Sequence, residues 1–114
     1  MDGLMANAVE IVPFQPSDLG TTSLAVTATT GNRVLASAGA ASVVLTNIGP
    51  SDCFGRFGNS AVEATVPSGA TAGGFPVLAG SQVTVRPDTG DTHLALICAT
   101  GGTATVYISA GSGA

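Results

Sequence analysis

The chain has 114 residues, of which 45% are hydrophobic and only 9% are charged, and its formal net charge is −4. This length suits one domain, and the hydrophobic content excludes a disordered chain, because disordered chains combine low hydrophobicity with high charge. The three basic residues are all arginines, so the chain lacks the basic footprint that nucleic acids and anionic membrane surfaces require.

The first 21 residues are predicted to form an extended arm. Pro13 and Pro16 lie in it, and proline cannot donate a hydrogen bond to a β-ladder, which favours an arm or an edge piece over a central strand. Residues 7–12 have the alternation expected of an arm that adds a strand to the sheet of a neighbouring molecule. The residues expected to contact this partner are Val9, Ile11, Val12 and Phe14.

Short runs of β-type sequence, punctuated by glycine and proline, fill residues 22–110. Turn signals recur about every 8–12 residues, which is typical of a sandwich or a jelly roll, and no segment has a helical period. The predicted fold is therefore all-β, a single-domain antiparallel β-sandwich or jelly-roll-like barrel with the arm before it and a flexible tail at residues 111–114. The expected strands are residues 23–29, 33–37, 41–48, 52–58, 61–66, 75–78, 82–86, 93–99 and 103–109.

Two cysteines, Cys53 and Cys98, are the only thiols of the chain. They are too few for a disulfide framework or a zinc site. We interpret them as buried, reduced side chains that act as small hydrophobic groups. A bridge between them requires that their strands be neighbours in the sheet.

The residues able to carry chemistry form no recognisable catalytic constellation. His93 is the one histidine, and Asp91 lies two residues before it, but there is no G-x-S-x-G nucleophile elbow. Asp88 and Asp91 bracket a turn, where aspartate bonds to nearby backbone. The glycines of residues 69–74 lack the lysine and the helix of a phosphate loop. The chain is predicted not to be an enzyme, and no catalytic, cofactor-binding or metal-binding residue is assigned.

The most specific local pattern spans residues 47–58, where one strand ends in a turn and the next brings an arginine between two phenylalanines. Strand alternation places Phe54 and Arg56 on one face and Phe57 on the other. All three are interpreted as structural residues. Arg56 is expected to stack on Phe54 or to reach a carboxylate such as Glu63.

The layout of residues 33–110 resembles that of short all-β structural proteins of phage virions. The segments that carry the likeness are residues 43–49 (VVLTNIG), 53–58 (CFGRFG), 78–81 (LAGS), 92–97 (THLALI) and 102–108 (GTATVYI). The resemblance implies a capsid decoration (cement) protein or another small virion component. It brings no catalytic residue and no cofactor with it.

The resemblance also implies where the protein acts and with what. The expected partner is the major capsid protein or another virion protein, and the expected state is a homo-oligomer, with a trimer favoured. The protein would be made in the host cytoplasm and end on the capsid surface. Two alternatives stay open: a tail, baseplate or fibre component, and a carbohydrate or cell-surface binding module, although the chain has no tryptophan for a sugar platform.

Overall fold

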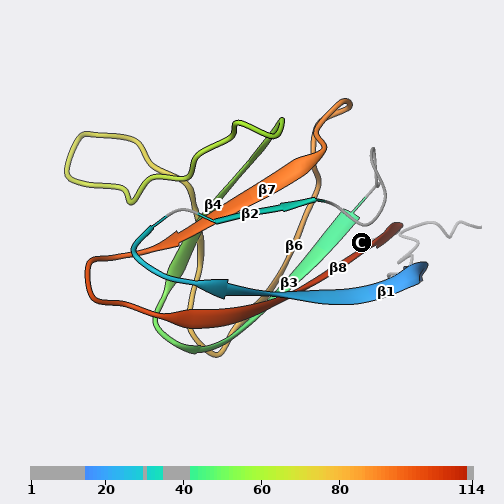
Figure 1. Cartoon of the computed structure of the whole chain (residues 1–114), viewed down its shortest axis with the longest axis horizontal. Coiled ribbons are helices and arrows are strands. Elements are labelled where there is room, and N and C mark those ends of the chain that lie inside the picture. Colours follow the sequence, from blue (N-terminus) through green and yellow to red (C-terminus); the bar gives the residue numbers. More distant parts are fainter. Residues whose placement is uncertain (1–14, 30, 35–41, 113–114) are drawn as a thin grey trace, which may run out of the picture.

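The computed structural model describes residues 15–29, 31–34 and 42–112, and among these residues it shows strands and no helix (Figure 1). Valine, threonine and isoleucine are frequent in the strands, because their branched side chains pack well on a pleated surface. The strands are β1 (Gln15–Val26), β2 (Gly31–Val34), β3 (Ser42–Pro50), β4 (Cys53–Gly58), β5 (Phe75–Val77), β6 (Gln82–Val85), β7 (His93–Cys98) and β8 (Ala104–Ser112).

These strands form two antiparallel sheets of four strands each. The first sheet has the order β1-β8-β3-β6, and the second has the order β2-β7-β4-β5. The pairs β1/β8, β2/β7, β3/β6 and β4/β5 are nested one inside the next along the chain. The molecule is thus a long hairpin, with its tip between β4 and β5, rolled up into two layers. The predicted all-β class is confirmed, and the two antiparallel sheets are consistent with the predicted sandwich.

An aliphatic core fills the space between the two layers. Every second side chain of the central strands points inward, as in Val43 and Leu45 of β3 and Leu94 and Leu96 of β7, and all four are fully buried. At the β4–β5 side, Phe57 stacks on Phe75 with ring centroids 5.7 Å apart. The other buried members of the core are Val26, Cys53, Val77, Cys98, Ala104, Val106, Ile108 and Ala110.

Ile108 and Ile48 offer a matched test of this core, because the first is 1% exposed and the second 58% exposed. We expect Ile108→Val to lower the free energy of unfolding by about 1 kcal/mol, since one buried methyl group is lost and a small cavity remains. Ile48→Val is the control and should change it by well under about 0.5 kcal/mol. Urea denaturation of both variants measures the difference, and equal effects would contradict the assignment of the core face.

The strand predicted at residues 61–66 is wrong, because this segment belongs to neither sheet. Its alternation is nevertheless real: Val62 and Val66 are half-buried and Ala64 is buried, while the residues between them are exposed. The segment lies on the outer side of the second sheet, where Val62 fills the space beside Gly58. A half-buried segment that lies across the outside of a sheet shows the same alternation of buried and exposed side chains as a strand within a sheet.

The first strand begins earlier than expected, within residues 1–21, which are predicted to form the arm. β1 starts at Gln15, and its partners on β8 include Gly111 and Ser112, so residues 15–21 and 111–112 lie in strands. Pro16 lies in this strand, at the edge of the first sheet, where a missing N–H is tolerated. The predicted contact residues Val9, Ile11, Val12 and Phe14 lie outside the described residues.

Candidate functional site

The outer faces of the two sheets differ in what covers them. On the second sheet, Ala95 points outward from β7, as its pairing with Arg56 shows, yet it is fully buried. Part of that cover is the segment at residues 59–66, where the Ser60 carbonyl accepts a hydrogen bond from the Asn32 side chain of β2 at 3.0 Å. On the first sheet, Tyr107 points outward from the central strand β8 and is 41% exposed. The described residues therefore leave the outer face of the first sheet bare.

We call this bare surface the hydroxyl face. It consists of the outward side chains of β1, β8, β3 and β6, which the register places in rows across the sheet. None of the side chains described on it is charged, and Arg86, directly after β6, is the nearest charged residue along that strand. The members are Thr21, Ser23, Ala25, Thr105, Tyr107, Ser109, Val44, Thr46, Ile48, Gln82 and Thr84.

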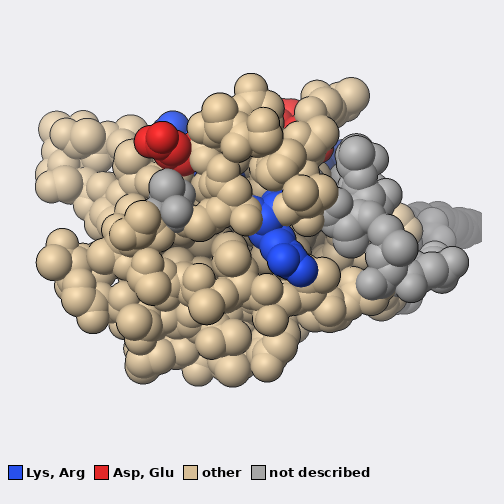
Figure 2. Space-filling model, viewed as in Figure 1, with Lys and Arg blue, Asp and Glu red and all other residues tan. Residues whose placement is uncertain are grey.

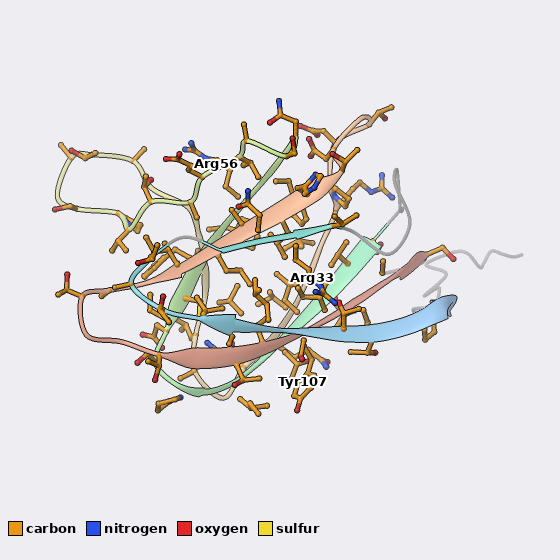
Figure 3. All side chains as sticks on the ribbon, viewed as in Figure 1. Arg33, Arg56 and Tyr107 are labelled. Carbon is orange, nitrogen blue, oxygen red and sulfur yellow. The ribbon has the colours of Figure 1, made fainter. Side chains whose placement is uncertain are left out.

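Hydrogen bonds between strands hold several of these polar groups in place. The hydroxyls of Thr21 and Ser109 lie 2.6 Å apart, and the Gln82 side chain donates to the Thr46 hydroxyl at 2.9 Å. Tyr107 stands between Ser23 and Thr46 in the register and points away from the core (Figure 3). In the view of Figure 2, no charged side chain is seen over β8. The described part of the face is mostly polar and uncharged.

Two open hollows lie at the end of the sandwich where the β3–β4 and β7–β8 turns meet. The larger, of about 590 Å³, is lined by both turns together with Phe54 and Val66. The smaller, of about 380 Å³, lies next to it and is lined in part by Ile97 and Cys98. The carboxylate of Asp52, at the rim of the larger hollow, accepts a hydrogen bond from the backbone N–H of Ala79 at 2.8 Å.

The faces predicted for Phe54, Arg56 and Phe57 are confirmed. Phe57 packs inward against the core, whereas Phe54 and Arg56 lie on the outer face of β4 with Ile97 and Ala95 as their partners on β7. The predicted contacts of Arg56 are not present: among the described residues, it forms no ion pair with Glu63 and no ring contact with Phe54. Arg56 is exposed to solvent instead.

An Arg56→Ala variant should therefore keep the free energy of unfolding within about 0.5 kcal/mol of the wild type, because an exposed side chain without a fixed partner contributes little. Thermal unfolding at low and at high salt measures this. A loss above about 1 kcal/mol that disappears in high salt would reveal an ion pair and contradict the expectation.

Arg33 is a residue to which the sequence assigned no role. In β2 it pairs with Leu94, so it points toward the inside of the sandwich, and it is half-buried. Figure 3 shows it between β2 and β1, which are the edge strands of the two sheets. Among the described residues no carboxylate pairs with it. The sequence signal for this inward orientation is the alternation of β2, which places Arg33 on the same side of the strand as Gly31.

The residues with acid–base chemistry are dispersed among the described elements. His93 begins β7, and its Nδ1 lies 2.8 Å from the Thr92 hydroxyl. The carboxylate of Asp91 accepts a hydrogen bond from the Asp88 backbone, so the turn predicted there is confirmed. Within the described ranges, no three His, Cys, Asp or Glu side chains gather as a metal site would need, and no helix is long and apolar enough to span a membrane.

The two cysteines, in contrast, meet. Cys53 and Cys98 are direct partners on β4 and β7, and their sulfur atoms lie 3.5 Å apart in the core. Burial, with the neighbouring Cys98 as a second cause, raises the pKa of the Cys53 thiol from 9.0 to about 12. The folded state thus holds this proton more tightly than the unfolded chain does, so the thiol's contribution to stability is lost as the pH rises above about 9.

Comparison of the chain with protein-family models, with curated proteins and with solved structures finds no match.

Proposed function

We propose that this protein is a structural component of a bacteriophage particle, and that it is a capsid decoration (cement) protein which binds the outer shell through the hydroxyl face. The observation that carries the proposal is the bare, uncharged outer face of the first sheet. A face of this kind suits permanent burial against another protein surface.

Desolvation explains why such a face suits an assembly. A charged side chain that is buried at an interface loses its hydration and needs a well-placed partner, whereas a hydroxyl or amide needs only one hydrogen bond. Several groups of the hydroxyl face already have such a bond to a neighbouring strand. Tyr107, near the middle of the face, supplies the kind of large amphipathic side chain that dominates binding energy at protein interfaces.

The strand order also supports the proposal. Two four-stranded sheets with the orders β1-β8-β3-β6 and β2-β7-β4-β5 have the winding of an eight-stranded jelly roll. This architecture is common in viral capsid proteins and in lectins. Since a fold alone does not define a function, the strand order supports the proposal without carrying it.

We further propose that the protein self-associates, with a trimer as the favoured state. Among the described strands, the edge strand β1 has β8 as its single neighbour in the sheet, so its other side offers backbone hydrogen-bonding groups to a second chain. The predicted arm, whose residues 1–14 precede this edge, is the segment proposed to add to the sheet of the adjacent copy. Size-exclusion chromatography with light scattering tests this, and a strict monomer at all concentrations would exclude it.

The test of the main proposal is binding to purified capsids of the phage that encodes the protein. We expect Ser23→Asp, which places a charge beside Tyr107, to weaken binding roughly 10- to 100-fold, because the carboxylate would be buried without a partner. The control is Thr71→Asp, which adds the same charge on an exposed loop far from the hydroxyl face along the chain. Co-sedimentation with capsids measures both. Equal binding by the two variants, or no binding by the wild type, would exclude the proposed interface.

The alternatives differ in what each predicts. A tail, baseplate or fibre component would also use the hydroxyl face, and labelling of negatively stained particles with a specific antibody separates tail from shell. A carbohydrate-binding module would instead use the larger hollow, which is lined by Asp52 and Phe54 together with Thr100 of the β7–β8 turn. That module would bind on a glycan array, and Phe54→Ala would abolish the signal.

A further inference from the structure

We infer that Cys53 and Cys98 form a cross-strand disulfide when the protein passes from a reducing to an oxidising environment. In the reduced state they are a buried pair of thiols, and the fold already holds them in place for the bond. The inference concerns the chemistry of this chain; only its timing in the life of a particle rests on the proposed function.

Strand register provides the first argument. Direct partners on antiparallel strands have Cα atoms about 4.5–5.5 Å apart, which falls within the range of about 4.4–6.8 Å that a disulfide spans. Cys53 and Cys98 are such partners, and their side chains point to the same side of the sheet, into the core. Their sulfur atoms are 3.5 Å apart, so a small rotation of the two side chains brings them to bonding distance.

The surroundings of the pair explain why the thiols stay reduced where the cell supplies a reductant. Both side chains are buried, and the polar atoms within hydrogen-bonding distance of them are neutral: the Ser51 carbonyl and the Asn47 side-chain amide near Cys53, and the Val26 carbonyl near Cys98. Among the described residues no cation lies there to stabilise a thiolate. Burial, the neighbouring Cys98 and the charge of Asp52 together raise the pKa of Cys53 to about 12. Oxidation is therefore slow, and it is completed only under sustained exposure to an oxidant.

The position of the pair in the sandwich explains how an oxidant reaches it. Cys53 is the first residue of β4 and Cys98 is the last residue of β7, so both lie directly beneath the turns at one end of the molecule. Cys98 contributes to the lining of the smaller hollow, which opens at that same end. A local opening of these turns exposes Cys98 without unfolding of the sheets.

The reaction is an ordinary thiol–disulfide exchange with a small disulfide such as oxidised glutathione. The Cys98 thiolate attacks one sulfur of the oxidant, which breaks its S–S bond and releases one glutathione thiolate. The Cys53 thiolate then attacks Cys98 Sγ in the mixed disulfide and releases the second. The two protons of the cysteines pass to the two glutathione molecules, which are thus reduced by two electrons as the protein is oxidised by two.

In a particle, this bond would act as a lock that forms after release from the host. The reducing cytoplasm keeps both thiols reduced during folding and assembly, and the medium outside the cell oxidises them to the disulfide. The closed loop joins positions 45 residues apart along the chain and ties β4 to β7 beside the turns. The expected consequence is a decoration protein that unfolds at higher temperature outside the cell than inside it.

The experiment follows the full chain, purified under reduction, during incubation with oxidised glutathione in native buffer. We expect both thiols to disappear, the intact mass to fall by two hydrogen atoms, and a proteolytic map to show one peptide pair joined through Cys53 and Cys98. The unfolding midpoint of the oxidised form should rise by on the order of 10 °C. Persistence of both free thiols, glutathione adducts as the final product, or a lower unfolding midpoint would each overturn the inference.

Cys53→Ala and Cys98→Ala provide the controls, since each leaves one thiol and should show no rise in midpoint with the oxidant. Comparison of the oxidised and reduced wild type uses a single polypeptide, so the inference stays testable if either variant fails to fold. Capsid binding of the two redox forms is measured in parallel. A disulfide that forms in a protein without capsid binding would exclude the proposed function and keep the disulfide; free thiols in a protein that binds would do the opposite.

Discussion

Replacing Asn47 by alanine is expected to lower the free energy of unfolding by about 3–5 kcal/mol, because one buried side chain satisfies several backbone groups at once. Asn47 is 1% exposed. Its side-chain amide donates to the Ser51 and Val77 carbonyls, both at 2.9 Å, and its side-chain oxygen accepts from the Gly49 N–H at 2.7 Å. Alanine removes all three bonds and leaves those backbone groups unsatisfied.

An Asn47→Asp variant separates hydrogen bonding from volume, since the two side chains have nearly the same shape. A carboxylate at this position would face the Ser51 and Val77 carbonyls, so burial should raise its pKa above that of the unfolded chain. The variant should then be more stable in acid than at neutral pH, with stability lost as the pH rises from the unfolded-state pKa through the raised folded-state pKa. Urea unfolding at both pH values measures this, and a variant as stable as the wild type at neutral pH would contradict the role of the amide.

Gly74→Ala is expected to destabilise the protein by about 3 kcal/mol, because the new methyl group would collide with backbone and not with a movable side chain. An added Cβ at Gly74 would lie 2.5 Å from the carbonyl oxygen of Gly55 and 2.8 Å from its nitrogen. Gly74 also donates its N–H to the Thr65 carbonyl at 2.8 Å, which anchors the loop that crosses the second sheet. Neither backbone segment can move without loss of such bonds.

Gly69→Ala is the matched control for Gly74→Ala. Gly69 lies in the same loop, has a positive φ of 56°, and has open space where a Cβ would stand. Its substitution should cost only the conformational penalty of about 1 kcal/mol. Thermal unfolding of the two variants gives the comparison. If Gly69→Ala were as damaging as Gly74→Ala, backbone conformation and not close approach would explain both.

The sequence predicted the strands well, since alternation and turn residues are local signals. β3 ends at Gly49-Pro50, and β7 and β8 flank Gly101-Gly102, as expected. It failed at residues 61–66, because a period of two reports one buried side and carries no information on hydrogen bonding. Asn47 lies in the strand expected at residues 41–48, and only the folded backbone shows that its side chain bonds to the Val77 carbonyl.

The candidate site was less accessible to prediction than the fold. Ser23, Thr46 and Tyr107 come from three strands that are far apart in the sequence, and only the register brings them into one row. The meeting of Cys53 with Cys98 depended on the same information, since it required that β4 and β7 be neighbours. Strand alternation identifies which side chains share a face of one strand. The pairing between strands decides which side chains of different strands become neighbours.

The nested strand order has a consequence for the synthesis of the protein. β1 is synthesised before the other described strands, yet β8, its single neighbour among them, is synthesised after all the others, so Thr21 can meet Ser109 only then. Contacts of such long sequence separation form slowly. The newly made chain therefore carries β1 without this partner until β8 has been made, and during that interval β1 is free to pair with β8 of another copy. Exchange of this strand between chains offers a direct route from one molecule to an oligomer.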